Sequence, residues 1–278
     1  MLGRGFKGSA PAAVGMVTDD IRLDVTDGVA TITLDRPDKM NALSPGINRG
    51  VGLALDEVAE RDDTRCVVVE GEGDAFCAGG DIGGMADGER STGHERATEI
   101  TEAAMGVSGR LHDFHLPTIA KVDGYCFGAG LGVALANDIV LASEDAWFSL
   151  AFRNVGLTLD YGTSYFVTKE VGPQKAKEIA LTGERLPGDR AEDMGLVNHA
   201  WPDDEFEERF ADFVETIASG PTVALQYSLR NIDRAGRRTL EEAIEAESEA
   251  QVFAGQTHDH EEGVTAFSED REPAFEGR

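Results

Sequence analysis

The sequence has little positive charge. Its 278 residues hold 52 acidic side chains against 25 lysines and arginines, a formal net charge of -27 at pH 7, and only six of the basic residues are lysines. Proteins that bind nucleic acid gather basic side chains on one face to displace counterions from phosphates, so we expect no nucleic-acid partner. Self-repulsion at this charge is screened within about 3 Å at about 1 M salt. The composition therefore indicates a halophilic protein of a salt-rich cytoplasm.

Long apolar runs and a cysteine framework are missing as well. No run approaches the roughly 18 apolar residues of a membrane span, and the opening MLGRGFKGSAPAAVG lacks the apolar centre of a signal peptide. We expect a cytoplasmic protein with no membrane partner. Cys66, Cys77 and Cys126 form neither an even disulfide set nor a Cys-x-x-Cys metal pattern. They are expected to be reduced core residues, and no metal site is expected.

Strand and helix patterns alternate along the first 200 residues. Apolar and polar residues alternate on both sides of Asp27-Gly28, which predicts a hairpin. The other expected elements are, in chain order, a helix near 46–59, a strand at 66–71, a helix near 95–112, and strands at 118–124 and 139–143. This order predicts an α/β fold with a layered core.

From about Gly172 onward the pattern is helical alone. Pro, Asp or Thr residues mark the starts of the predicted helices and Gly residues mark their ends. We therefore expect a disordered leader at 1–15, a core with the active site at 16–200 and a helical region at 201–278. In the helical region, Leu240, Ile244 and Val252 form an apolar stripe. The stripe either packs on the core or forms an oligomer interface.

Two glycine-rich turns follow predicted strands: Ala78-Gly79-Gly80-Asp81 and Gly128-Ala129-Gly130. Small residues let the backbone approach a ligand, and a turn that enters a helix leaves N–H groups unpaired. Two such turns can aim two amides at one oxygen as an oxyanion hole, in which each donor contributes a factor of about 10²–10³ in rate. The alternative is that the glycines only permit tight packing. Neither turn matches the phosphate-binding pattern G-x-x-x-x-G-K-[ST].

Five distinctive motifs extend this pattern from about Ile21 to Arg278: DRPDKMNALS, DAFCAGGDI, VDGYCFGAGLGVALANDIVLAS, VGPQKAKEIALTGERLPGDRAEDMGLVN and EEGVTAFSEDREPAFEGR. In them the chain resembles the crotonase, or enoyl-CoA hydratase/isomerase, superfamily. The resemblance implies a crotonase-like spiral of ββα turns with a helical C-terminal trimerisation region. It also implies homotrimers that often pair into hexamers, acyl-CoA thioester substrates, and no cofactor beyond the coenzyme A of the substrate.

The same resemblance implies the roles of individual residues. By position, the backbone N–H groups of Gly80 and Ala129 would be the oxyanion-hole donors for a thioester enolate. The loop around Lys39 would lie beside the nucleotide end of coenzyme A, where Lys39 could contact phosphate as a point charge. The further substrate contacts implied are Ala42, Ala78, Asp81, Ile82, Gly128 and Phe152.

One acid stands near these positions. Hydratases of the family carry two glutamates, and Gly132 and Phe152 stand in their places, neither of which can transfer a proton. Asp160 lies among apolar neighbours that would raise its pKa toward the range useful for acid–base catalysis; alternatively, it caps a helix that begins at Thr163. Its position resembles the catalytic aspartate of phenylacetate-pathway isomerases that convert a ring epoxide to an oxepin thioester. Asp160 is thus expected to shuttle the proton of a double-bond isomerase.

Three other functions stay open. An enoyl-CoA hydratase would need a non-standard carboxylate. Asp160, Thr163, Ser164 and Tyr165 resemble the D-x-x-T-S-Y motif of 4-chlorobenzoyl-CoA dehalogenase, in which the aspartate is a nucleophile, although that family has a tryptophan where Phe152 stands. A non-catalytic RNA-binding role, known for some relatives, conflicts with the net charge of -27.

Overall fold

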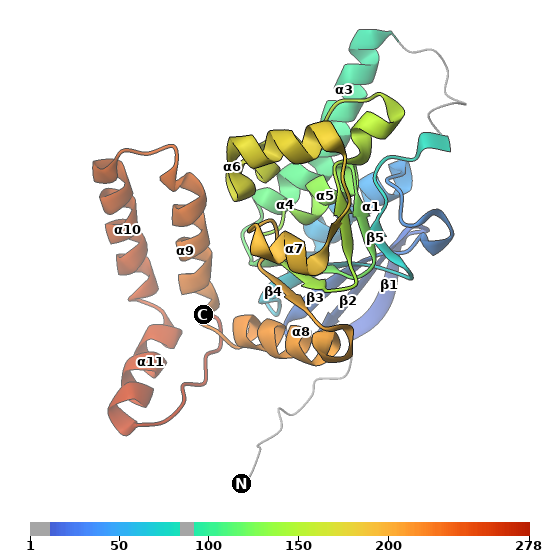
Figure 1. Cartoon of the computed structure of the whole chain (residues 1–278). Coiled ribbons are helices and arrows are strands. Elements are labelled where there is room, and N and C mark those ends of the chain that lie inside the picture. The colour runs from blue at the N-terminus through green and yellow to red at the C-terminus, as the bar shows by residue number, and fades with distance from the viewer. Residues whose placement is uncertain (1–11, 84–91) are drawn as a thin grey trace.

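Two β-sheets form the frame of the computed structural model, which describes residues 12–83 and 92–278 (Figure 1). Among these residues, the larger sheet has seven strands in the order β1 (Ala12–Thr18), β2 (Ile21–Thr26), β3 (Val29–Leu34), β4 (Cys66–Gly71), β6 (Thr118–Val122), β8 (Ile139–Ser143) and β11 (His199–Trp201). The smaller sheet has the order β10 (Leu186–Pro187), β9 (Trp147–Ser149), β7 (Tyr125–Phe127) and β5 (Ala75–Cys77).

The chain winds as a spiral that adds one strand to each sheet in turn. β4 of the larger sheet is followed by β5 of the smaller one, β6 by β7, and β8 by β9. From β3 to β11 the larger sheet is parallel, and so are β5, β7 and β9. This arrangement confirms the predicted α/β spiral.

The predicted hairpin is confirmed in detail. β2 and β3 pair in antiparallel register, with Thr26 opposite Val29. Between them, Asp27 and Gly28 have φ angles of 50° and 82°. Both values are left-handed, as a two-residue turn between twisted strands requires.

The helices are α1 (Pro45–Ala59), α3 (Gly93–Ala104), α4 (Arg110–His112), α5 (Ala129–Ala134), α6 (Thr163–Thr182), α7 (Gly188–Asp193), α8 (Asp203–Ala218), α9 (Thr222–Ala235), α10 (Leu240–Ala254) and α11 (His258–Glu269). Shorter 3-10 turns lie at Pro37–Lys39 and Ala151–Val155, and a π-helical turn at Met105–Gly109 joins α3 to α4. Ser44 starts α1, because its side chain accepts the N–H of Ile47.

The structure corrects two expectations. Ala12–Gly15 were expected to belong to the disordered leader, but they are part of β1, whose backbone pairs with β2; residues 1–11 of that leader lie outside the described residues. The second correction concerns the region after Gly172, which was expected to hold helices alone but also contains β10 and β11. α6 begins at Thr163, as expected, and bends at Gly172 (φ 75°, ψ 161°), where Pro173 disfavours helical geometry in the residue before it.

Both faces of the larger sheet are covered. Along β4, Val67 and Val69 belong to the main core, on the side of α1, whereas Cys66 and Val68 pack against α8. Alternate residues of a strand point to opposite faces of the sheet. Because both faces of β4 are buried, all of its positions in this run are apolar.

All three cysteines are free and buried, as expected. Burial raises the pKa of the Cys66 and Cys77 thiols to about 12, so these groups stay protonated. In the part of the chain that the structure describes, no cluster of three His, Cys, Asp or Glu side chains could hold a metal ion. No helix there is long and apolar enough to span a bilayer.

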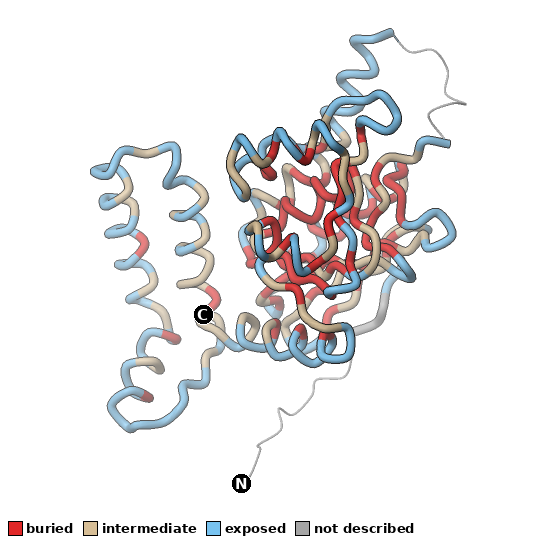
Figure 2. Tube along the Cα trace, in the orientation of Figure 1, coloured by how far each residue is buried: buried red, intermediate tan, exposed pale blue. Residues whose placement is uncertain are grey.

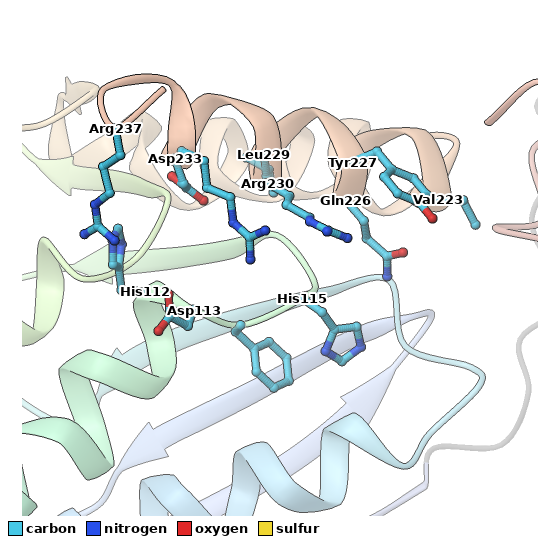
Figure 3. Close-up of a pocket in the computed structure, with 12 residues that line it drawn as sticks. His112, Asp113, His115, Val223, Gln226, Tyr227, Leu229, Arg230, Asp233 and Arg237 are labelled. Carbon is cyan, nitrogen blue, oxygen red and sulfur yellow. The ribbon is translucent and has the colours of Figure 1, made fainter. Parts of the chain in front are cut away.

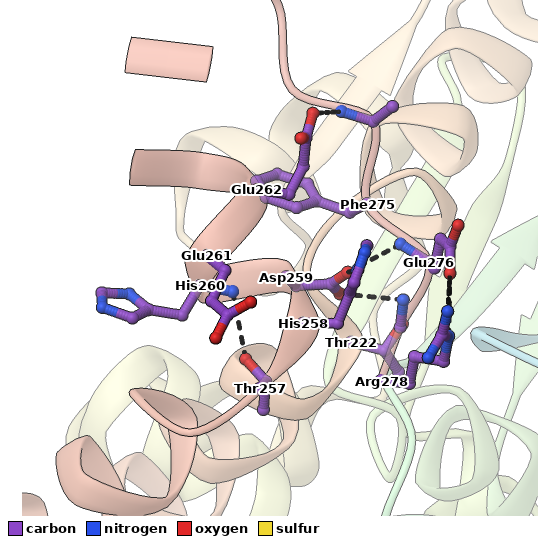
Figure 4. Close-up of polar contacts among 12 residues, drawn as sticks. Thr222, Thr257, His258, Asp259, His260, Glu261, Glu262, Phe275, Glu276 and Arg278 are labelled. Atoms are coloured by element: carbon purple, nitrogen blue, oxygen red, sulfur yellow. Dashed lines mark hydrogen bonds and ion pairs between the residues drawn. The ribbon is translucent and has the colours of Figure 1, made fainter. Parts of the chain in front are cut away.

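Helices α9, α10 and α11 form an arm (Thr222–Glu269) that projects beside the core (Figure 1) and is exposed over much of its length (Figure 2). The C-terminal tail returns toward α11, where the buried Asp259 accepts the N–H groups of Glu276 (2.7 Å) and Gly277 (2.8 Å) (Figure 4). Arg65 of the core donates to the carbonyl groups of Phe275 and Gly220, both at 3.1 Å. Polar contacts thus tie the arm to the core.

Candidate active site

The first glycine turn, after β5, lies against the second. Gly79 has a φ of 96°, and a methyl group on it would lie 2.8 Å from the carbonyl oxygen of Phe127 and 3.3 Å from the nitrogen of Ala129. Side-chain carbons do not approach backbone so closely, so only glycine fits here. The structure therefore brings the two turns into contact, as a shared oxyanion hole requires.

The backbone N–H groups of Gly80 and Ala129 belong to these two turns. Ala129 is the first residue of α5, so its N–H has no acceptor within the helix. The hydrogen bonds that tie the first turn to the loop before α1 use the N–H of Ala78 and the carbonyl of Gly79. Within residues 12–83 and 92–278, the N–H groups of Gly80 and Ala129 thus donate no hydrogen bond to the protein.

The second turn is equally tight. Gly128 has a φ of 55° and a ψ of -125°, and a methyl group on Gly130 would lie 2.3 Å from the carbonyl oxygen of Cys77. The ring of Phe152, only 8% exposed, comes within 3.9 Å of the position that a methyl group on Gly128 would take. Phe152 therefore forms an apolar wall beside the turn.

An ion pair joins the first turn to the expected coenzyme A loop. Arg36 donates to the carboxylate of Asp81 at 3.0 Å and to the carbonyl oxygen of the buried Ala42 at 3.1 Å. Sequence reasoning missed this link, because 45 residues separate the two charges. Lys39 and Ile82 are exposed, and Ala78 is half-buried.

The carboxyl group of Asp160 does not cap a helix. α6 begins after Gly162 without any side-chain cap, and it is the backbone carbonyl of Asp160 that accepts from Thr163, from its N–H at 2.9 Å and its hydroxyl at 2.6 Å. The capping alternative is wrong. Oδ1 of Asp160 is buried without a hydrogen-bond partner in the described part of the chain. Burial raises the pKa of this carboxyl, as predicted from its apolar neighbours.

Tyr161 anchors the segment that carries Asp160. Its hydroxyl donates to Oδ1 of Asn48 on α1 at 3.1 Å, its side chain is buried, and its φ is 49°, a strained value for a residue with a side chain. Burial raises the pKa of Tyr161 to about 12. Asn48 and Tyr161 were not predicted, since no local pattern links residues 113 positions apart.

The same segment fills the space beside Gly132. A methyl group on Gly132 would lie 2.5 Å from the hydroxyl of Thr163 and 2.8 Å from the carbonyl oxygen of Tyr161. The position is one turn of α5 beyond Ala129, which places the Asp160 segment next to the two glycine turns. A side chain at Gly132 is therefore sterically excluded as long as this segment keeps its place.

Asp138 has a structural place at the other end of α5. Its Oδ2 accepts from the N–H (2.7 Å) and the hydroxyl (2.9 Å) of Thr118, which joins the start of β6 to the start of β8. Burial raises the pKa of Asp138 to about 6. Its side chain is engaged in joining the two strands.

Comparisons with known proteins agree with this geometry. The family model described as enoyl-CoA hydratase/isomerase matches residues 24–278. A probable enoyl-CoA hydratase of Rhodobacter capsulatus is 35% identical over 258 residues, which cover 93% of this chain and 98% of that protein. The 1,2-epoxyphenylacetyl-CoA isomerase of Escherichia coli is 31% identical, covering 91% of this chain and 97% of that one. The crystal structure of an enoyl-CoA hydratase from Bacillus anthracis superposes with a TM-score of 0.87 at 27% identity, covering 94% of this chain and all of that one.

Proposed function

Because the chain belongs to the enoyl-CoA hydratase/isomerase family, we propose that it shifts a double bond in an unsaturated acyl-CoA thioester, with Asp160 as both base and acid. The observation that carries the proposal is the buried, unpartnered Oδ1 of Asp160. A buried carboxylate oxygen without a hydrogen-bond partner is uncommon in folded proteins and points to a functional role.

The reaction needs one carboxylate and two amides. The ionised Asp160 removes a proton from the carbon beside the thioester carbonyl, and the electron pair moves onto the carbonyl oxygen. The N–H groups of Gly80 and Ala129 hold that enolate oxygen. The protonated Asp160 then returns the proton two carbons further along as the double bond moves, so no water is consumed and no further cofactor is proposed.

The alternatives lack parts that they need. Hydration would require carboxylates that activate a water, but Gly132 has no room for a side chain and Phe152 forms an apolar wall. Dehalogenation would use Asp160 as a nucleophile, with Phe152 in place of the usual tryptophan. RNA binding would have to overcome the net charge of -27.

We also propose that the arm assembles the chain into homotrimers or hexamers. Leu240, Ile244 and Val252 are 78%, 52% and 59% exposed, which contradicts the alternative that this stripe packs on the core. Large apolar side chains gathered on one surface are typical of an interaction site.

Two substrates and one substitution test the isomerase. With a 3-enoyl-CoA, the wild type should move the double bond and exchange the proton beside the thioester with deuterium oxide; with a 2-enoyl-CoA, water addition should be slow. Asp160→Asn should lower kcat by about 10²–10⁴, whereas Asp145→Asn, an exposed acid outside the site, should not. Fast hydration that survives Asp160→Asn would overturn the proposal.

The pH profile gives a second readout. Because burial raises the pKa of Asp160 above 3.8 and the base must be ionised, the acid limb of kcat/KM should lie above that value. A profile that stays flat down to about pH 4 would show that another group supplies the base.

A further inference from the structure

A cavity beside α9 gathers positive charge in this acidic chain. Its volume is about 540 Å³, and it lies between α9 and the segment that follows α4 (Figure 3). Arg230 and Arg234 line it from α9, Arg237 lines it from the turn after α9, and His112 and His115 line it from the core. Gly80, Ala129 and Asp160 do not line it, so the cavity is separate from the candidate active site.

The three arginines lie at the end of α9. Arg230 and Arg234 are four residues apart and therefore lie on one face of the helix. Arg237 lies in the turn that follows the end of α9 at Ala235. Figure 3 shows the side chain of Arg230 on α9 and that of Arg237 just beyond it, on the side of α9 that faces the core segment.

Two of these three guanidinium groups have no protein partner among the described residues. Within residues 12–83 and 92–278, those of Arg230 and Arg234 make no hydrogen bond or ion pair, and that of Arg237 donates only to the hydroxyl of Tyr165, at 3.2 Å. Two acids, Asp113 and Asp233, line the same cavity without pairing with them. The hydrogen bond from Arg237, and a further one from Lys169, lower the pKa of Tyr165.

The lining indicates the chemistry of a ligand. A guanidinium group donates two parallel hydrogen bonds to phosphate or carboxylate, and three guanidinium groups in one cavity can bind more than one anionic group. Phe114 and Tyr227 add aromatic rings to the lining, and the volume lies within the range of small-molecule sites. We propose that this cavity binds an organic phosphate of the nucleoside diphosphate class, at a site separate from the one that carries out catalysis.

Calorimetric titration with ADP tests the site. The protein is first saturated with a thioether analogue of an acyl-CoA, so that the active site is filled. One further equivalent of ADP should then bind per chain at about 0.1 M ionic strength, and more weakly at about 1 M, where charges are screened within about 3 Å. Pyrophosphate should also bind, and adenosine should bind least.

Matched variants locate the binding. Arg230→Ala/Arg234→Ala/Arg237→Ala should weaken ADP binding by on the order of a hundredfold. Arg61→Ala/Arg96→Ala/Arg209→Ala removes the same charge elsewhere and should leave binding within about threefold, a difference below the tenfold step of 1.4 kcal/mol. If the triple alanine variant does not fold, the variant with lysine at the same three positions serves instead. It keeps the positive charge but loses the paired N–H donors of the guanidinium groups, so ADP should again bind more weakly.

The proposal fails if the wild type binds no additional equivalent of ADP. It also fails if the triple variant of the cavity and the triple control variant bind ADP with the same affinity. Asp160→Asn should leave ADP binding unchanged, so the failure of this site and the failure of the isomerase are distinguishable.

Discussion

The core and the arm are held together in different ways. In the core, single methyl groups are excluded at Gly79, Gly130 and Gly132, because backbone atoms already fill the space. In the arm, Phe267 is 90% exposed and Leu240 is 78% exposed, while buried polar contacts attach the tail. The core is thus closely packed around its glycine turns, whereas the arm leaves large apolar side chains exposed.

Placing a side chain at Gly132 in the core should have the largest effect on the free energy of unfolding. Gly132→Glu restores the residue type of a hydratase, but its side chain would meet Thr163 and Tyr161. We expect a loss of roughly 4 kcal/mol or more in the free energy of unfolding, from overpacking and a buried charge, and no gain of hydration. Denaturant unfolding and a hydratase assay check this. A stable variant that hydrates a 2-enoyl-CoA would show that the segment moves aside.

Removing the hydrogen bonds that Asp259 accepts from the C-terminal tail should have the next largest effect on stability. Asp259→Ala leaves the N–H groups of Glu276 and Gly277 without their acceptor, at a cost of about 2–3 kcal/mol. The loss should be local, so hydrogen exchange should speed up in the tail and α11 but not in β4 or β6. The exposed Glu261→Ala serves as control. Equal acceleration throughout the chain would mean that core and arm unfold as one unit.

Asp138 should give a smaller, pH-dependent effect in the core. Its pKa is raised from 3.8 to about 6, so the folded state keeps a proton that the unfolded chain has lost. The associated stability is complete below about pH 4 and is lost as the pH rises through about 6. Relative to Asp138→Asn, the wild type should therefore lose on the order of 1–2 kcal/mol over that range. A difference that does not change with pH would contradict the assignment.

Changing exposed apolar residues of the arm should barely affect the stability of the isolated chain. Leu240→Ser/Phe267→Ser removes apolar groups that contact mainly solvent, so the free energy of unfolding of a dilute monomer should change by less than about 0.5 kcal/mol. The mass measured by light scattering should fall if the arm assembles the protein. An unchanged oligomer would place the interface elsewhere.

Local sequence patterns predicted the parts of the site that depend on backbone geometry. The Asp27-Gly28 hairpin and the two glycine turns were predicted from short-range signals, and the structure brings the turns together. The contact between Tyr161 and Asn48 could not be predicted, because it depends on where α1 packs after the chain has folded. Nor could the sequence decide whether Asp160 caps α6, since an aspartate just before a helix fits both alternatives.

Asn48 lies in the first turn of α1, only a few residues after the loop that Arg36 ties to Asp81. Tyr161, which holds on to Asn48, is the immediate neighbour of Asp160. One short helical turn and one side-chain hydrogen bond therefore connect the Arg36–Asp81 ion pair to the residue beside Asp160. Under the proposed function, a displacement of that loop on substrate binding would reach Asp160 along this path.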